Sequence, residues 1–157
     1  MKVLAVICLI GLASSIAISQ TGAFAKARHI GEGTSRSFFL FSTSAGKYTI
    51  RHDGFGEVAA IGKRKEVFFS SLNPGSRLER VYFSEYEGDL LLLYEVSEGR
   101  STGRSLLRMN QQTRKLRWLK WIQVDDIASC VIEGDEVHCG SAENVTKIDV
   151  KTGKQIS

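Results

Sequence analysis

The chain has 157 residues, of which 43% are hydrophobic and 24% are charged. This composition indicates one folded domain and excludes an intrinsically disordered chain, which would have fewer apolar residues and a larger net charge. A single proline, Pro74, excludes a collagen-like or proline-rich fibre. The formal net charge of +4 is a mild basic excess, so we expect no nucleic-acid partner.

The N-terminal residues have the composition of a signal peptide. Lys2 precedes an apolar run over residues 3–13, and a small, polar stretch follows as far as Gly22. Ala23-Phe24-Ala25 then places small residues at the two positions that a signal peptidase reads. We therefore predict a leader over residues 1–25, and a cut after Ala17-Ile18-Ser19 is the competing choice.

The alternative to a cleaved leader is an uncleaved membrane anchor. The apolar stretch from Val3 to Ile18 has 16 residues, whereas a helix that spans a bilayer needs about 20. Cleavage leaves 132 residues, with 20 Lys and Arg against 17 Asp and Glu. We therefore expect an exported protein, periplasmic or extracellular, without stable membrane insertion after cleavage.

Residues 26–36 form a polar N-terminal arm in this prediction, and residues 37–157 form a single all-β domain. Turn signals recur about every 8–14 residues, close to the spacing of about 8–12 that is typical of short antiparallel strands. The intervening β-branched and aromatic runs are Ser37–Thr43, Tyr48–Arg51, Val67–Ser70, Arg80–Ser84, Leu90–Val96, Leu116–Ile122 and Val145–Val150. We predict an antiparallel meander of about eleven short strands.

Two of these segments carry a further indication. Leu90-Leu91-Leu92-Leu93 is apolar at successive positions, which is typical of an inner strand that is buried on both faces. Residues 113–123 could be wrapped as an amphipathic helix, but their Trp and Ile content fits a strand at least as well.

Two segments in the C-terminal half read as copies of one unit. Each opens on a Glu-Gly-Asp turn, at residues 87–89 and 133–135, and each ends in a second turn, at residues 109–115 and 148–154. The second turns are offset by 39 residues and the first by 46. A period of about 40–45 residues with about four strands is the signature of a propeller blade.

The segment Val145–Lys154 resembles the repeat of the quinoprotein-type (PQQ-like) β-propellers. In that repeat a strand ends in Asp, a Lys-Thr-Gly-Lys-like turn follows, and a Trp often closes the next strand. This chain has Asp149 at the strand end, and Trp118 in the looser copy, where Asn110 stands for Asp and Arg114 for Gly. The resemblance covers about 70 residues, 87–156, and implies a propeller-like fold with an interaction role.

The length of the chain limits the propeller interpretation. At about 40–45 residues per blade the mature chain would contain about three blades, whereas propellers usually have four to eight. A propeller fragment would therefore be open or would self-associate to complete a ring. A β-sandwich and an open barrel are the alternative folds.

Cations and indoles are mixed in residues 114–121, with two more arginines just upstream. Regular alternation would place Leu116 and Trp118 on one face of a strand and Arg117, Leu119 and Trp121 on the other. Such a surface would bind an anion or a sugar, because indoles stack on sugar rings and arginine forms bidentate hydrogen bonds with carboxylates. The alternative is that Trp118 is a core residue and that the cations keep an edge strand from pairing with another chain. The candidate ligand-binding residues are Arg104, Arg108, Arg117, Trp118 and Trp121.

The sequence shows no catalytic, metal or cofactor motif, so we expect no cofactor. His52 and Asp53 are adjacent, and an extended backbone would point their side chains to opposite faces. The three histidines lack the spacing of metal ligands.

Two classes of function remain. The leading one is a small exported, non-enzymatic binding or scaffolding module that recognises a protein or an envelope polymer through its loops. The alternative is a small exported hydrolase, or an inhibitor of one, whose site forms only in the fold. Such a site would bring His52 and Asp125 or Asp126 together with a serine.

Cys130 and Cys139 flank a tight-turn signal, Gly134-Asp135. A two-residue loop would place the cysteines in a non-hydrogen-bonded pair, whose Cα atoms lie ~4.5 Å apart. A disulfide accepts that distance, and an exported compartment favours its formation. The alternatives are a redox pair, which would have the C-x-x-C spacing, and a metal site, which would need two more ligands. We predict a structural disulfide, and Cys8 leaves with the leader.

Overall fold

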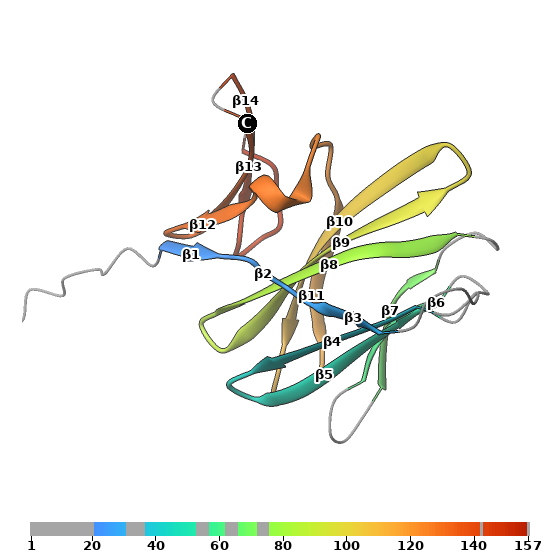
Figure 1. Ribbon diagram of the computed structural model, residues 1–157. Helices are drawn as coiled ribbons and strands as arrows, with labels where there is room; N and C mark the ends of the chain where they lie inside the picture. The colour runs from blue at the N-terminus through green and yellow to red at the C-terminus, as the bar shows by residue number, and fades with distance from the viewer. Residues whose placement is uncertain are drawn as a thin grey trace, which may run out of the picture.

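Three antiparallel β-sheets make up the part of the chain that the computed structural model describes, residues 21–30, 37–52, 57–61, 66–71, 76–141 and 143–156 (Figure 1). The all-β, antiparallel prediction is confirmed. Within these ranges the one helical element is a short 3-10 turn, η1 (Ile127–Ser129), and none of the three sheets closes into a barrel. A search of the same residues finds no helix with the length and apolarity to cross a membrane.

The N-terminal sheet has five strands and is an antiparallel meander. In spatial order they are β3 (Arg28–Ile30), β4 (Ser37–Thr43), β5 (Gly46–His52), β6 (Glu57–Ile61) and β7 (Glu66–Ser71). The bounds of β4 are those predicted, because the run of aromatic and small polar residues ends at the turn before Gly46. Gly46 has a φ of +128°, which the absence of a Cβ atom permits.

The middle sheet also has five strands. Its members are β2 (Ala25–Lys26), β8 (Arg77–Tyr86), β9 (Asp89–Glu98), β10 (Ser101–Asn110) and β11 (Leu116–Trp121), in the spatial order β11-β10-β9-β8-β2. Residues 113–123, which fitted both a helix and a strand, contain the strand β11. The strands β8, β9 and β10 are each ten residues long, which makes them the longest strands among the described residues.

The C-terminal sheet has four strands in the order β1-β12-β13-β14. They are β1 (Thr21–Ala23), β12 (Val131–Glu133), β13 (Glu136–Ser141) and β14 (Asn144–Asp149). The two-residue turn at Gly134-Asp135 sets the predicted register, with Val131 opposite His138. The predicted Cys130–Cys139 disulfide is present, with the two Cα atoms 4.0 Å apart.

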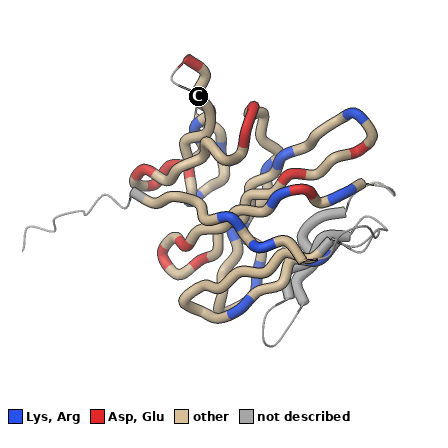
Figure 2. The backbone as a smooth tube through the Cα atoms, in the orientation of Figure 1, with Lys and Arg blue, Asp and Glu red and all other residues tan. Residues whose placement is uncertain are grey.

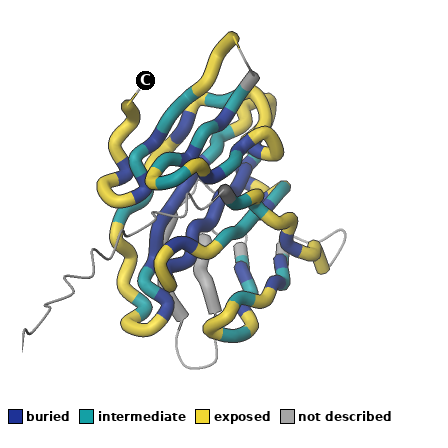
Figure 3. Tube along the Cα trace, turned by 90° about the vertical axis from the view of Figure 1, so that its left-hand side faces the viewer, coloured by how far each residue is buried: buried dark blue, intermediate teal, exposed yellow. Residues whose placement is uncertain are grey.

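The middle sheet is buried on both faces, between the other two sheets (Figures 1 and 3). Leu90 and Leu92 point toward the N-terminal sheet, where the Phe41 and Phe83 rings stack with their centroids 4.4 Å apart. Leu91 and Leu93 point toward the C-terminal sheet. All four leucines are fully buried, so the prediction of an inner strand is confirmed. Each contributes about 1.5–3 kcal/mol of burial free energy.

Residues 21–30 run across all three sheets. β1 lies beside β12, β2 lies beside β8 and β3 lies beside β4, so this segment adds one edge strand to each sheet (Figure 1). The predicted polar arm, residues 26–36, therefore begins in β2 and includes β3, and residues 31–36 lie outside the described residues.

Candidate functional site

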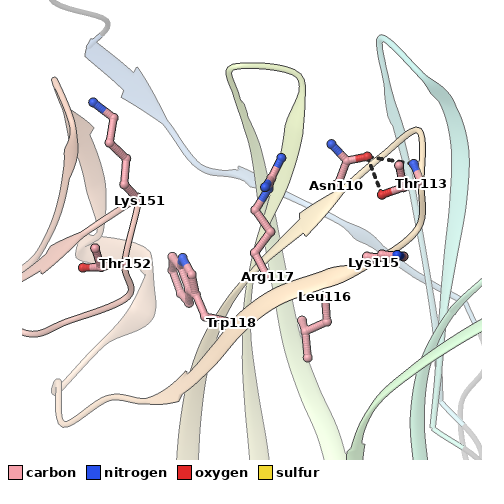
Figure 4. A pocket seen from close by; sticks show the side chains of 8 residues that line it. All are labelled: Asn110, Thr113, Lys115, Leu116, Arg117, Trp118, Lys151 and Thr152. Atoms are coloured by element: carbon pink, nitrogen blue, oxygen red, sulfur yellow. Dashed lines mark hydrogen bonds between the residues drawn. The ribbon is translucent and has the colours of Figure 1, made fainter.

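A groove of about 530 Å³ lies between β11 and the turn that follows β14 (Figure 4). It is bordered by the middle sheet and the C-terminal sheet. The buried apolar side chains packed between these two sheets are called the second core below. The residues that line it are Asn110, Thr113, Lys115, Leu116, Arg117, Trp118, Lys151 and Thr152. Three of these eight are cations and none is acidic, so the wall of the groove is positively charged.

The two turns that border the groove have the same internal hydrogen bonds. Asn110 Oδ1 accepts from the N–H and the hydroxyl of Thr113, at 2.7 and 2.8 Å. Asp149 Oδ1 accepts from the N–H and the hydroxyl of Thr152, both at 2.6 Å. In each turn the residue four positions later also donates its N–H to the carbonyl of the Asn or Asp, at 2.9 and 2.8 Å. These local bonds are typical of Asx turns, and they hold one threonine hydroxyl on each side of the groove.

Trp118 forms the floor of the groove and packs against the turn after β14. Its indole N–H donates to the Val150 carbonyl at 2.9 Å, and the ring is half-buried against the second core. A Cβ atom at Gly153 would lie 2.6 Å from this ring, and Gly153 has a φ of +69°. Only glycine meets both requirements, because a side chain would collide with the indole and strain the backbone.

Arg117 lies beside Trp118 because β11 contains a bulge. Arg108 pairs with Trp118 and Met109 pairs with Leu116, which leaves Arg117 as the extra residue. The prediction that Arg117 and Trp118 lie on opposite faces is therefore wrong, since regular alternation stops at the bulge. Both side chains line the groove (Figure 4).

A buried ion pair between Asp89 and Arg108 lies next to the groove and contacts its residue Arg117. The Asp89 side chain is 1% exposed and the Arg108 side chain is 7% exposed, with Nε and Oδ2 2.6 Å apart. Asp89 also accepts hydrogen bonds from Arg117 and from the Asn110 side-chain amide, the latter at 2.9 Å. Burial alone would raise the pKa of Asp89, but the hydrogen bonds from Arg117 and Arg108 outweigh it and hold that pKa below its ordinary value.

The Arg108 guanidinium is fully engaged inside the fold. Besides Asp89, it donates to the Val150 carbonyl at 3.2 Å and lies 5.0 Å from the centroid of the Tyr86 ring. Tyr86 in turn donates its hydroxyl hydrogen bond to Asp135. Arg108 was predicted to bind a ligand, and the structure places it in the packing between two sheets instead of on the wall of the groove.

The other two predicted residues lie toward the opposite end of β10. Arg104 Nε is 2.8 Å from Glu95 Oε2, and Trp121, whose side chain is mostly exposed, lies over Gly103. The structure therefore brings Arg117 and Trp118 together and separates them from Arg104 and Trp121.

Six groove residues were not among the candidates from the sequence: Asn110, Thr113, Lys115, Leu116, Lys151 and Thr152. The signal that would have found the two threonines is the 39-residue offset between the turns at 109–115 and 148–154, which places Thr113 and Thr152 at matching positions.

The two lysines of the groove differ in their ion pairs. Lys151 pairs with Asp135, which raises the pKa of Lys151. Lys115 has no ion-pair partner within the described ranges.

Glu95 is the centre of a second charged network, away from the groove. Arg80 donates to both of its carboxylate oxygens, at 2.9 and 2.8 Å, and Arg104 donates to one of them. The hydrogen bond from Arg80 lowers the pKa of Glu95; burial opposes it, and Arg104 adds to it. Arg80 also reaches Asp126 at 2.8 Å.

This network predicts an acid-dependent loss of stability. The pKa of Glu95 is lower in the folded state than its ordinary value of 4.5. Its stabilising contribution is therefore complete above pH 4.5 and is lost as the pH falls through the lower folded-state pKa. Urea unfolding measured from pH 7 down to pH 3 should show a fall that is shallower in Glu95→Gln than in the wild type. Parallel curves for the two proteins would contradict the assignment.

The residues of the alternative hydrolase site do not gather where the structure describes them. Asp126 caps η1 by accepting from the Ala128 N–H at 3.1 Å. Asp125 lines a separate polar cavity of about 300 Å³ next to β14. The side chain of His52 lies outside the described residues. A search of the described residues finds no group of three His, Cys, Asp or Glu side chains that could hold a metal ion.

Acidic side chains lie next to the groove and pair with two of its three cations. Acidic residues concentrate at the β8–β9 and β12–β13 turns, which lie on the same side of the molecule (Figure 2). Asp89 in the first turn pairs with Arg108 and Arg117, and Asp135 in the second pairs with Lys151.

The resemblance to quinoprotein propellers stays a prediction. No family model, curated protein or solved structure matches the chain.

Proposed function

We propose that the protein is a small exported, non-enzymatic binding module that holds an acidic envelope polymer in the groove between β11 and the turn after β14. The observation that carries the proposal is the charge of the wall, where Lys115, Arg117 and Lys151 stand without an acidic neighbour among the lining residues. Asp89, which is shared by Arg108 and Arg117, and Asp135, which pairs with Lys151, offset part of this charge from outside the lining, and Lys115 has no ion-pair partner among the described residues.

The other lining groups suit a sugar that carries an acid. Trp118 offers part of its indole ring, and sugar rings stack on indoles. The hydroxyls of Thr113 and Thr152 lie at the two sides, fixed by their turns. A volume of about 530 Å³ falls within the range of about 300–1,000 Å³ typical of ligand sites.

Export is supported by two independent features. The first 25 residues contain a cationic start, a short apolar centre and small residues at two cleavage positions. The Cys130–Cys139 disulfide is compatible with an oxidising compartment outside the cytoplasm. The two threonine hydroxyls of the lining donate to Asn110 and Asp149 within their own turns, which fixes their positions and suits a binding role.

Titration with a polyuronate chain tests the proposal directly. Reversal of charge in Lys115→Glu or Lys151→Glu should weaken binding at least about tenfold, which corresponds to roughly 1.4 kcal/mol, because each change places a carboxylate against an acidic ligand. Lys120→Glu is the matched control, since Lys120 is exposed on the same strand outside the groove. It should retain wild-type affinity when binding is measured by isothermal titration calorimetry.

Salt and a neutral polymer complete this test. Added salt should weaken the polyuronate complex, because charges exposed to solvent are screened beyond about 10 Å at 0.1 M ionic strength. Dextran, which lacks carboxylates, should bind much more weakly. Equal affinity for the two polymers, or equal loss in Lys120→Glu and Lys115→Glu, would refute the groove as the binding site.

A further inference from the structure

Residues 21–25 belong to the folded domain, although the leader predicted from the sequence includes them. β1 pairs antiparallel with all three residues of β12 and covers that edge of the C-terminal sheet. Gly22 lies against the side chain of Ile132, which is part of the second core. Phe24 is half-buried and packs on the same core. These contacts form only if residues 21–25 remain attached to the mature chain.

The same segment continues into the middle sheet without a break. Ala25 lies opposite Phe83 and Lys26 lies opposite Tyr82, so β2 spans the bond between Ala25 and Lys26. The next residue, Ala27, is buried and donates its N–H to the Val81 carbonyl at 2.9 Å. A cut after Ala25 would divide β2 and would remove the edge strand of the C-terminal sheet.

We propose that the leader is cut after Ser19, so that the mature protein begins at Gln20. A signal peptide leaves the chain before the exported domain folds, so residues with native contacts in two sheets lie downstream of the cut. Ala17-Ile18-Ser19 places small residues at both positions that signal peptidase reads, and the cut would leave β1 intact. This inference rests on the export that is part of the proposed function, and it is independent of what the groove binds.

Mass spectrometry of the exported protein tests the position of the cut. The full chain is expressed with its own leader, recovered from outside the cytoplasm and digested, and the N-terminal peptide is identified. We expect it to begin at Gln20, with or without the loss of ammonia that accompanies cyclisation of an N-terminal glutamine. A start at Lys26 would overturn the inference and leave export and polymer binding untouched. Recovery of full-length chain from the membrane fraction would instead overturn export, and the inference with it.

Two matched substitutions make the test sharper. A bulky residue immediately before the cut blocks signal peptidase, which requires a small one. Ser19→Leu should therefore abolish the start at Gln20, whereas Ala25→Leu, at an exposed position of β2, should be processed as the wild type is. The reverse pattern, with processing lost only in Ala25→Leu, would overturn the proposal.

A stability comparison provides a readout that does not depend on the peptidase. Chains covering residues 20–157 and 26–157 are produced without the leader, oxidised and melted side by side. The shorter chain should have a lower melting temperature, because it lacks β1, Phe24 and half of β2. Equal melting temperatures would show that residues 21–25 add nothing to the fold, which would remove the basis of the inference.

Discussion

Replacement of Asp89 with alanine is expected to lower the free energy of unfolding by about 3–5 kcal/mol. The Asp89 and Arg108 side chains are almost completely buried, and removal of Asp89 leaves the interior charge of Arg108 with Glu87 alone, whose half-exposed carboxylate lies 3.5 Å away. Arg108 cannot turn to solvent, because the Val150 carbonyl and the Tyr86 ring hold its guanidinium between two sheets. For a domain whose total stability is about 5–15 kcal/mol, this loss is a large fraction. Urea unfolding monitored by circular dichroism measures it.

Two further variants distinguish the buried ion pair from a general effect of substitution in a turn. Asp135→Ala changes the equivalent position of the other Glu-Gly-Asp turn, where the carboxylate is half-exposed, and it should cost much less. Asp89→Leu combined with Arg108→Met should recover much of the loss, because apolar side chains of similar volume often replace a buried pair without cost. If Asp89→Ala lost less than about 1 kcal/mol, the pair would behave as an exposed salt bridge, contrary to its burial.

Loss of the Cys130–Cys139 disulfide is expected to lower the free energy of unfolding by about 2–3 kcal/mol, because the bond closes a loop of roughly ten residues and restricts the unfolded chain. Both cysteines are buried beside η1 and β12, where they are part of the second core. The double variant Cys130→Ala with Cys139→Ala should show this loss. Reduction of the wild type should produce a similar decrease, whereas a reductant should not affect the double variant.

Thiol labelling checks the same bond chemically. The mature protein that we propose, denatured without reduction, should have no reactive thiol, because the proposed cut removes Cys8 and the other two cysteines are bonded. Two labelled thiols per chain would show that the disulfide does not form in solution. A small loss of stability together with full protection from labelling would instead indicate that the bond forms but that the unfolded chain is already restricted.

Local patterns were sufficient to predict several strands, β4 and β9 among them, and the hairpin that carries the disulfide. The bounds of β4 follow from a run of aromatic residues that ends at a turn. The pairing of Val131 with His138 follows from counting outward from the two-residue turn at Gly134-Asp135. The burial of Leu90 to Leu93 on both faces follows from four apolar residues in succession. In each case the determining signal lies within a few residues of the feature it determines.

Features that depend on distant partners were not predictable in this way. The bulge at Arg117 depends on how β11 pairs with β10, and it moves that side chain to the face of Trp118. Arg108 is buried because β9 brings Asp89 beside it. The strands at 21–26 were missed because their small and polar residues also match a cleavage region, and their partners, β12 and β8, lie far along the chain.

The position of β1 also determines when the domain can finish folding. The segment that contributes an edge strand to every sheet is the first part of the domain to be synthesised, yet its partner β12 is among the last. Pairing of such distant segments requires the closure of a long loop, which slows folding. β1 therefore stays unpaired until synthesis of the domain is nearly complete, and an unpaired strand invites association with another chain. During this delay β1 must be kept from pairing with the strands of other chains.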